Sequence, residues 1–187
     1  MSMTRSSTPT RRRFLHHTAH AAVVGALPAL AASVRAAVPG TRELAFVHTH
    51  TRERIDLVYA HGEHYLPAAC AALNRFLRDH YTGSVGAMDT RLFDLLHQVQ
   101  AVLGSKQSFE VISAYRCAAT NARLRESRAG GVAKHSLHLE GRAIDVRLVG
   151  VPLAELRDAA LSQRFGGVGF YPRDQFVHID TGRVRSW

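Results

Sequence analysis

Two stretches in the second half of the chain alternate apolar and polar side chains, and this alternation constrains the fold more than any other feature. In residues 142–148 (RAIDVRL), Ile, Val and Leu fall on one side and Asp145 on the other. In residues 176–182 (FVHIDTG), Val and Ile share one side, whereas His178 and Asp180 share the opposite one. Because side chains alternate across a strand, both stretches predict strands with one apolar and one polar face. Together they would present an aspartate and a histidine on the polar face of a sheet.

The rest of the chain mixes helical and strand patterns without regular strand-helix-strand alternation. In two segments Leu and Phe recur at steps of three and four residues, which predicts helices; Asp89 is a suitable N-cap for the second helix and Gly104 a suitable stop. The order predicts one α+β domain with a small, mainly antiparallel sheet that carries the functional site and is flanked by helices. The predicted elements are a β-hairpin in 43–65, helices at 66–80 and 89–103, a strand at 109–116, a short helix at 118–128, a strand at 142–150, a helix at 152–163 and a strand pair in 166–182.

The first 36 residues differ from the rest of the chain and predict an export signal. Arg11 and Arg12 precede a Phe-Leu step and a weakly apolar stretch, which is typical of twin-arginine signals. Small residues at 34 and 36 place the cleavage after Ala36, so the mature domain is predicted to span 37–187. A membrane anchor is the alternative, but the apolar run is shorter than the ~20 residues that a span needs, and it contains Pro28. We expect an exported, periplasmic protein without stable membrane insertion.

Much of the basic charge belongs to this predicted signal. The whole chain has a formal net charge of +9, and residues 1–36 hold five arginines and no acidic residue, so the remainder carries +4. A nucleic-acid-binding protein is expected to keep a clustered basic face, and export also argues against that partner. We therefore expect no nucleic-acid partner, and a mild positive charge suits an anionic cell wall.

The cysteines and two early histidines leave alternatives open. Cys70 and Cys117 would enter an oxidising compartment, which permits one disulfide. Cys70 lies in an apolar helical pattern, however, where a buried free thiol is the ordinary expectation. His48 and His50 would share a face of the predicted hairpin; with no acid or third histidine nearby in sequence, we interpret them as surface or groove-lining residues rather than metal ligands.

A third residue joins the polar strand faces, because His138 lies in the loop just before the strand with Asp145. Two neutral imidazoles and one carboxylate form a zinc site with an open fourth position for water, which is the arrangement of a catalytic site. Zinc would lower the pKa of that water toward ~7 and polarise a substrate carbonyl. The alternative is that these histidines are hydrogen-bonded structural residues.

The segment SLHLEGRAID (residues 136–145) matches the pattern Ser-x-His-x-x-Gly-x-Ala-x-Asp. It resembles the D-Ala-D-Ala carboxypeptidase and dipeptidase family of zinc peptidases, whose sites are related to those of lysostaphin-like enzymes and hedgehog. SAYR (113–116), TNARLR (120–125) and the stretch 166–187 are similar to the YcbK-like branch of murein endopeptidases. The resemblance covers roughly residues 45–187.

The resemblance implies that His138, Asp145 and His178 bind one zinc ion on the sheet. It also implies that Arg116 holds or polarises the substrate carbonyl or carboxylate, a task that suits a permanently charged, forked donor. The alternative for Arg116 is an ordinary surface ion pair. Ser136 would line the substrate groove or, equally, cap its own backbone.

The general base is less well defined. Relatives in the dipeptidase branch have an acid three residues before the last zinc histidine, where this chain has Gln175. Asp174 is adjacent but would face the other way. Asp180 shares a face with His178, and we predict that it is either the base or a residue that orients the metal site. Glu140 and His135 are predicted to face solvent.

These features predict an exported zinc peptidase that hydrolyses amide bonds of peptidoglycan stem peptides or their cross-links. The first alternative is a binding module in which zinc only braces the fold and the groove retains cell-wall peptide; the absent acid at Gln175 supports it. The second alternative is a carboxypeptidase that releases the terminal D-amino acid.

Overall fold

The computed structural model describes residues 40–127 and 132–187. The predicted export signal and its cleavage site lie outside these residues. Within the described part of the chain, no helix has the length and apolar character needed to cross a membrane.

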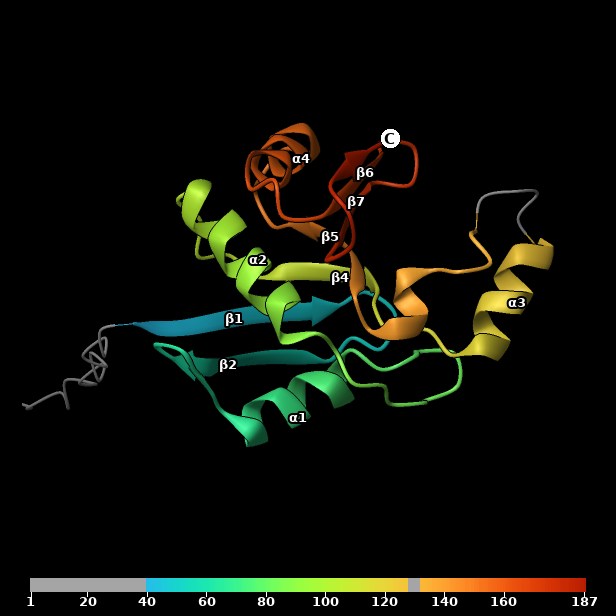
Figure 1. The fold of residues 1–187 in the computed structure, drawn as a ribbon, viewed down its shortest axis with the longest axis horizontal. Coiled ribbons are helices and arrows are strands. Elements are labelled where there is room, and N and C mark those ends of the chain that lie inside the picture. Colours follow the sequence, from blue (N-terminus) through green and yellow to red (C-terminus); the bar gives the residue numbers. More distant parts are fainter. Residues whose placement is uncertain (1–39, 128–131) are drawn as a thin grey trace, which may run out of the picture. The chain divides into compact units, whose positions relative to one another are not determined.

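A mixed sheet of eight strands forms the centre of the fold (Figure 1). The β1–β4 and β6–β8 pairs are parallel and the other five pairs are antiparallel. The α+β class and the mainly antiparallel sheet are therefore confirmed, but the sheet is larger than predicted, because short strands extend both edges. In spatial order the strands are β3 (His64–Tyr65), β2 (Arg54–His61), β1 (Thr41–His48), β4 (Phe109–Ser113), β5 (Ala143–Leu148), β7 (Phe176–Asp180), β6 (Gly167–Tyr171) and β8 (Arg185–Ser186).

Within residues 40–127 and 132–187, four α-helices and one 3-10 helix connect the strands. The Asp89 side chain accepts the N–H of Arg91 and caps α2 as predicted. Helix α1 is shorter than predicted and ends at Phe76, because the chain then enters a turn in which Asp79 Oδ1 accepts the N–H of Tyr81. The helices are α1 (Pro67–Phe76), α2 (Thr90–Val102), α3 (Ala118–Ser127), η1 (Leu137–Glu140) and α4 (Leu153–Ser162).

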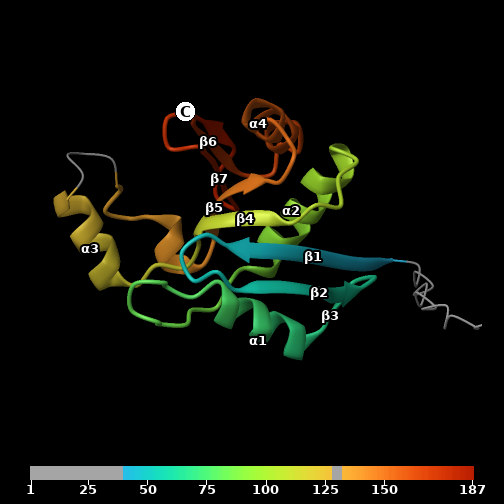
Figure 2. The same cartoon turned by 180° about the vertical axis from the view of Figure 1, so that it is seen from behind.

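The core lies between one face of the sheet and helices α1, α2 and α4. In Figure 2, seen from behind, β1 and β4 lie in front of α2, so the helices cover the opposite face. α3 lies apart from these helices, near η1, in both views (Figures 1 and 2). Strand residues that face the helices are buried, and they alternate with the residues that form the site described below. The buried core includes Phe46, Val111, Ile144, Val146, Val177, Ile179, Leu73, Leu92, Leu96 and Leu156.

Candidate metal centre

The register of β5 and β7 brings the predicted polar side chains together. Asp145 on β5 lies opposite His178 on β7, and Ala143 lies opposite Asp180. Their neighbours Ile144 and Val146 are buried in the core, so alternation directs Asp145 to the other face of the sheet.

The 3-10 helix η1 supplies His138 to the same place. Ser136 caps this helix, with its hydroxyl accepting the N–H of His138 at 3.4 Å. Gly141 ends it with a φ of 64°, and a Cβ there would lie 2.0 Å from the carbonyl oxygen of Ala87. Only glycine satisfies both conditions, so the Ser and Gly of the motif SLHLEG shape the short helix that carries His138. The structure thus shows Ser136 in a local capping contact.

Three ligand atoms converge: His138 Nε2, His178 Nδ1 and Asp145 Oδ1. The two nitrogens are 3.3 Å apart, and the oxygen lies 3.3 Å from His138 and 2.8 Å from His178. A tetrahedral zinc ion with bonds of ~2.0–2.1 Å requires ligand atoms about 3.3 Å apart. Among the described residues this is the one group of three such side chains whose ligand atoms lie within 4.8 Å of one another. The donor set and its spacing fit a zinc ion.

The hydrogen bonds around the histidines leave these two nitrogens available to bind a metal. His138 Nδ1 donates to the carbonyl oxygen of Ala114 at 2.6 Å, and His178 Nε2 donates to Asp180 Oδ2 at 3.1 Å. When both histidines are neutral, each therefore turns a lone pair toward Asp145.

Burial and neighbouring charges shift the pKa of each of the three groups. Burial lowers the pKa of His138. Burial opposes the charged form of Asp145, but its contacts with His138 and His178 outweigh this and lower its pKa. Burial also opposes a charge on His178, yet its hydrogen bonds to Asp145 and Asp180 raise its pKa to about 9. The hydrogen bond from His178 Nδ1 to Asp145 thus stabilises the protonated form of the His178 ring.

Asp180 is fully buried and its oxygens are occupied. Oδ1 accepts the N–H groups of Gly167 at 2.9 Å and Gly182 at 2.8 Å, and Oδ2 accepts from Arg185 at 2.7 Å. Oδ2 also accepts from His178 Nε2, the nitrogen that does not face the other two ligands. Asp180 is thus placed to hold the ring of His178 in one orientation.

Arg116 follows β4 and is only 8% exposed, unlike an ordinary surface ion-pair residue. Its backbone N–H donates to the carbonyl oxygen of His138 at 3.1 Å. Its guanidinium nitrogen Nη2 lies 3.5 Å from Asp145 Oδ2. The structure therefore places a buried guanidinium directly beside the three ligand side chains.

The acids and amide considered as bases lie elsewhere. Gln175 is exposed in the turn between β6 and β7, has a φ of 59° and donates to the carbonyl oxygen of Pro172. Asp174 is exposed in the same turn. Glu140 is exposed and pairs with Arg142 at 3.0 Å. His135 is also exposed.

The sequence did not direct attention to Trp187, whose ring centroid lies 5.3 Å from that of His178. Its indole N–H donates to the hydroxyl of Tyr171 at 2.7 Å. A Cβ at residue 169 would lie 2.7 Å from the indole, so Gly169 makes room for it. The one signal available was that this is the chain's single tryptophan.

The remaining predictions about cysteines and histidines have mixed outcomes. Cys70 and Cys117 are both free thiols. The interpretation of His48 as a surface or groove-lining residue is wrong, because it ends β1 fully buried, with its ring 6.0 Å from that of Phe76. His50 is exposed.

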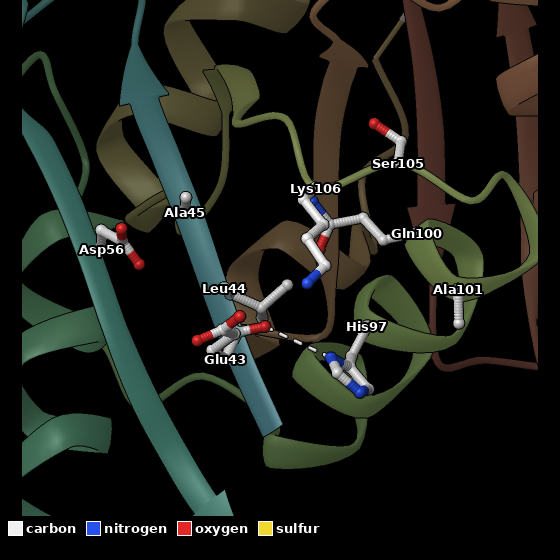
Figure 3. A pocket seen from close by; sticks show the side chains of 9 residues that line it. All are labelled: Glu43, Leu44, Ala45, Asp56, His97, Gln100, Ala101, Ser105 and Lys106. Atoms are coloured by element: carbon white, nitrogen blue, oxygen red, sulfur yellow. Dashed lines mark hydrogen bonds between the residues drawn. The ribbon is translucent and has the colours of Figure 1, made fainter. Parts of the chain in front are cut away.

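A separate hollow of about 270 Å³ lies between β1, α2 and the loop before β4, and it shares no residue with the metal centre (Figure 3). In Figure 3 its lining carries charges of both signs, from Glu43, Asp56 and Lys106, and His97 Nδ1 is hydrogen-bonded to the carbonyl oxygen of Glu43. The mixed charge selects no class of ligand. The convergent side chains, not the hollow, mark the candidate site.

Comparison with known proteins identifies the family. A family model of M15 peptidases described as "Peptidoglycan L,D-endopeptidase MepK" matches residues 36–187. The Escherichia coli K12 protein named "Peptidoglycan L,D-endopeptidase MepK" is 44% identical over 149 residues, which are 80% of this chain and 81% of the relative. The Haemophilus influenzae protein named "Probable peptidoglycan L,D-endopeptidase MepK" is 42% identical over 150 residues, or 80% of each chain.

The chain belongs to the MepK family of M15 peptidases. The family match includes the three converging side chains, Arg116 and Trp187, since it extends to the last residue of the chain.

Proposed function

We propose that this chain is an exported zinc endopeptidase that hydrolyses an L,D amide bond in peptidoglycan peptides. The observation that carries the proposal is the convergence of His138, Asp145 and His178, with ligand atoms spaced for a tetrahedral ion, in a member of the MepK family. The names of its E. coli and H. influenzae relatives supply the substrate and the bond.

One zinc ion would be held by His138 Nε2, His178 Nδ1 and Asp145 Oδ1. Bound there, zinc supplies a Lewis acid that polarises a carbonyl group and makes water acidic near neutral pH. The protein's part is to keep the two imidazoles in the correct tautomer, through the carbonyl oxygen of Ala114 and the carboxylate of Asp180.

Arg116 would bind the substrate carbonyl and stabilise the negative charge that develops on its oxygen. The guanidinium remains protonated at every relevant pH and is held beside Asp145, so it needs little reorganisation during the reaction. Ser136, at the start of η1, would lie along the peptide groove while it caps His138.

Of the two roles predicted for Asp180, the geometry favours orientation of His178. A base needs an oxygen free to take a proton from water, whereas both oxygens of Asp180 are buried and hydrogen-bonded. Burial opposes the charge of Asp180, but the bonds from His178 and Arg185 outweigh it and lower its pKa. We therefore assign Asp180 as a positioning residue.

Export by the twin-arginine route to the periplasm is part of the proposal. The family match begins at residue 36, next to the predicted cleavage site, which supports removal of residues 1–36. A mature domain with charge +4 would then meet the anionic peptidoglycan.

The test is to incubate purified, zinc-loaded protein with muropeptide monomers and cross-linked dimers, and to follow products by mass spectrometry. We expect dimers to be cut, a chelator to abolish cutting and added zinc to restore it. His138→Ala should be inactive at equal concentration. Retention of peptide without products would instead favour the binding module, and trimming of pentapeptide monomers alone would favour the carboxypeptidase.

A further inference from the structure

The three peptide N–H groups around Arg116 are fixed from two sides. They point alternately in opposite directions, as in an extended chain. The outer two bond to the segment that follows α1, whereas the central one bonds to helix η1, which carries His138. The pairs are Tyr115 N–H to Leu77 O (3.1 Å), Arg116 N–H to His138 O (3.1 Å) and Cys117 N–H to Asp79 Oδ2 (2.9 Å).

Asp79 differs from the other two acceptors, because its side chain, and not a main-chain carbonyl, accepts the N–H. Asp79 is 1% exposed. Oδ1 accepts the N–H groups of Tyr81 at 2.9 Å and Thr82 at 3.3 Å, and the hydroxyl of Thr120 also bonds to the carboxylate. Burial opposes the charge, but these bonds and that from Cys117 outweigh it and lower the pKa of Asp79 to about 2.

The backbone of Asp79 is itself held in a closed turn. Its N–H donates to the carbonyl oxygen of Ser84 at 2.9 Å, and its carbonyl oxygen accepts the N–H of Gly83 at 2.7 Å. The carboxylate is therefore presented from a rigid support to the start of α3, immediately after Arg116. A buried anion is costly to maintain, and packing alone does not require one here.

We infer that Asp79 is a positioning residue, which holds the Arg116–Cys117 peptide so that the Arg116 guanidinium lies beside Asp145. The inference rests on the proposed function of Arg116 in substrate binding. Without the carboxylate, the partly buried N–H of Cys117 loses its acceptor and the backbone of 115–117 relaxes. A displacement of about 1 Å in such a group costs up to about 100-fold in rate.

The test compares Asp79→Asn in the wild-type and Arg116→Ala backgrounds, on the zinc-loaded protein with cross-linked muropeptide. Asn has the same size as Asp, but its NH2 group would face some of the N–H groups that now donate to the carboxylate. We expect Asp79→Asn alone to lower kcat/KM by about 10–100-fold, mostly through kcat, with zinc content unchanged. In the Arg116→Ala background it should change kcat/KM by less than about 3-fold, because its partner is already absent.

Asp94→Asn is the matched control. Asp94 on α2 is a partly buried carboxylate with several donors, like Asp79 but less buried; it accepts from Tyr59 at 3.0 Å and from Arg42 and Tyr65, all away from the metal centre. We expect it to lower stability without a selective effect on Arg116. If Asp79→Asn reduces kcat/KM by the same factor in both backgrounds, or not at all in the wild type, the inference is wrong.

Hydrogen exchange of the metal-free protein provides a readout independent of activity. Asp79→Asn should speed exchange of the amides of 115–117, whereas Asp94→Asn should not. Unchanged exchange there overturns the inference, even if Arg116→Ala is too slow to assay. If the wild-type protein cuts no muropeptide, the proposed function fails, but this exchange experiment still decides whether Asp79 holds the loop.

Discussion

A contact on the far side of each histidine ring decides which of its nitrogens would bind the proposed metal. His138 gives its Nδ1 proton to Ala114 and His178 gives its Nε2 proton to Asp180. The residue that selects the nitrogen of His178 is thus a charged group with four other donors, two of them backbone N–H groups of glycines and two from Arg185. Single substitutions at these contacts should weaken metal binding more than they disturb the fold.

Asp180→Asn should weaken zinc binding by about 10–100-fold. An amide NH2 in place of Oδ2 would donate to His178 Nε2 and move the ring proton to Nδ1, which must bind the metal. Competition with a chelator measures the zinc Kd. Asp158→Asn, at a side chain that is 63% exposed and paired with Arg157, should leave the Kd unchanged. Lost turnover with an unchanged Kd would instead identify Asp180 as the proton acceptor.

Zinc uptake should release about one proton from the metal-free protein below pH 9. His178 has a pKa raised to about 9, so at neutral pH it carries a proton that zinc must displace, whereas the pKa of His138 is lowered. The apparent zinc affinity should therefore rise about tenfold per pH unit and level off above pH 9. Titration calorimetry in buffers of different ionisation enthalpy counts the protons; none released at pH 7.5 would contradict the assignment.

The raised pKa of His178 also predicts how the stability of the metal-free protein depends on pH. A group whose folded pKa exceeds its unfolded value contributes stability that is complete below the unfolded pKa of about 6.5. This contribution is lost as pH rises through about 9. Metal-free protein should thus lose stability between these values, and zinc-loaded protein should lose less, because the metal replaces the proton.

At the scale of elements, the strands were predictable and the contacts between distant segments were not. Alternation in 142–148 is a local property, so the face of Asp145 follows from the sequence alone. The capping of α2 by Asp89 followed similarly from a local pattern. The pairing of Asp145 with His178 depends on the register of two strands that are distant in sequence, so only the structure shows it. The bond from Cys117 to Asp79 joins two segments with no shared pattern, so only the structure shows it. His48 was misplaced although it continues the buried face of β1 formed by Leu44 and Phe46, where Phe76 of α1 packs against its ring.

A substitution at Gly141, where helix η1 ends, tests whether the shape of this helix is needed for stability and zinc binding. Gly141→Ala meets both a left-handed φ of 64° and the carbonyl oxygen of Ala87 at 2.0 Å. Gly150 is the matched control, since its φ is 74° with nothing within 4 Å of a Cβ. We expect Gly150→Ala to cost about 1–2 kcal/mol of unfolding free energy from backbone strain alone. Gly141→Ala should cost at least ~1 kcal/mol more, because the clash forces the backbone apart.

Denaturant unfolding measures both losses, and chelator competition measures the zinc Kd. Gly141→Ala should also weaken zinc binding, because η1 carries His138, whereas Gly150→Ala should not. Equal losses of stability in the two variants, with unchanged zinc binding, would show that η1 tolerates the displacement.

For the whole molecule, the stability of the fold should fall with decreasing pH in two stages. The first is caused by histidines and the second by carboxylates. Burial, together with the neighbouring His80 and His50, lowers the pKa of His48 to about 4, and burial together with His50 lowers that of His80 to about 4. Both lie in a cluster of rings, with His80 stacked on His50 at 4.2 Å. The carboxylates of Asp79, Asp145 and Asp180 have lowered pKa values as well.

The histidines and the carboxylates lose their contributions to stability in separate pH ranges. A histidine whose folded pKa lies below about 6.5 is neutral in the fold, while the unfolded chain takes up a proton below that pH. Stability is therefore lost first between about pH 6.5 and 4, from the histidines. A carboxylate whose pKa is lowered by folding stabilises the fold above its unfolded pKa of about 4. This stabilisation is lost only below that pH.

His80→Gln separates the two stages. It removes a partly buried ring whose protonation the fold resists, so Tm should fall less between pH 6.5 and 4 than in the wild type, while the fall below pH 4 remains. His64→Gln, at an exposed residue of β3, is the control and should keep the wild-type profile. Thermal unfolding at half-unit pH steps measures the slopes, with zinc removed so that loss of the metal does not add to the first stage; His138, whose pKa is also lowered, contributes equally in all three proteins. A first stage of equal slope in all three proteins would mean that the ring cluster does not govern acid stability.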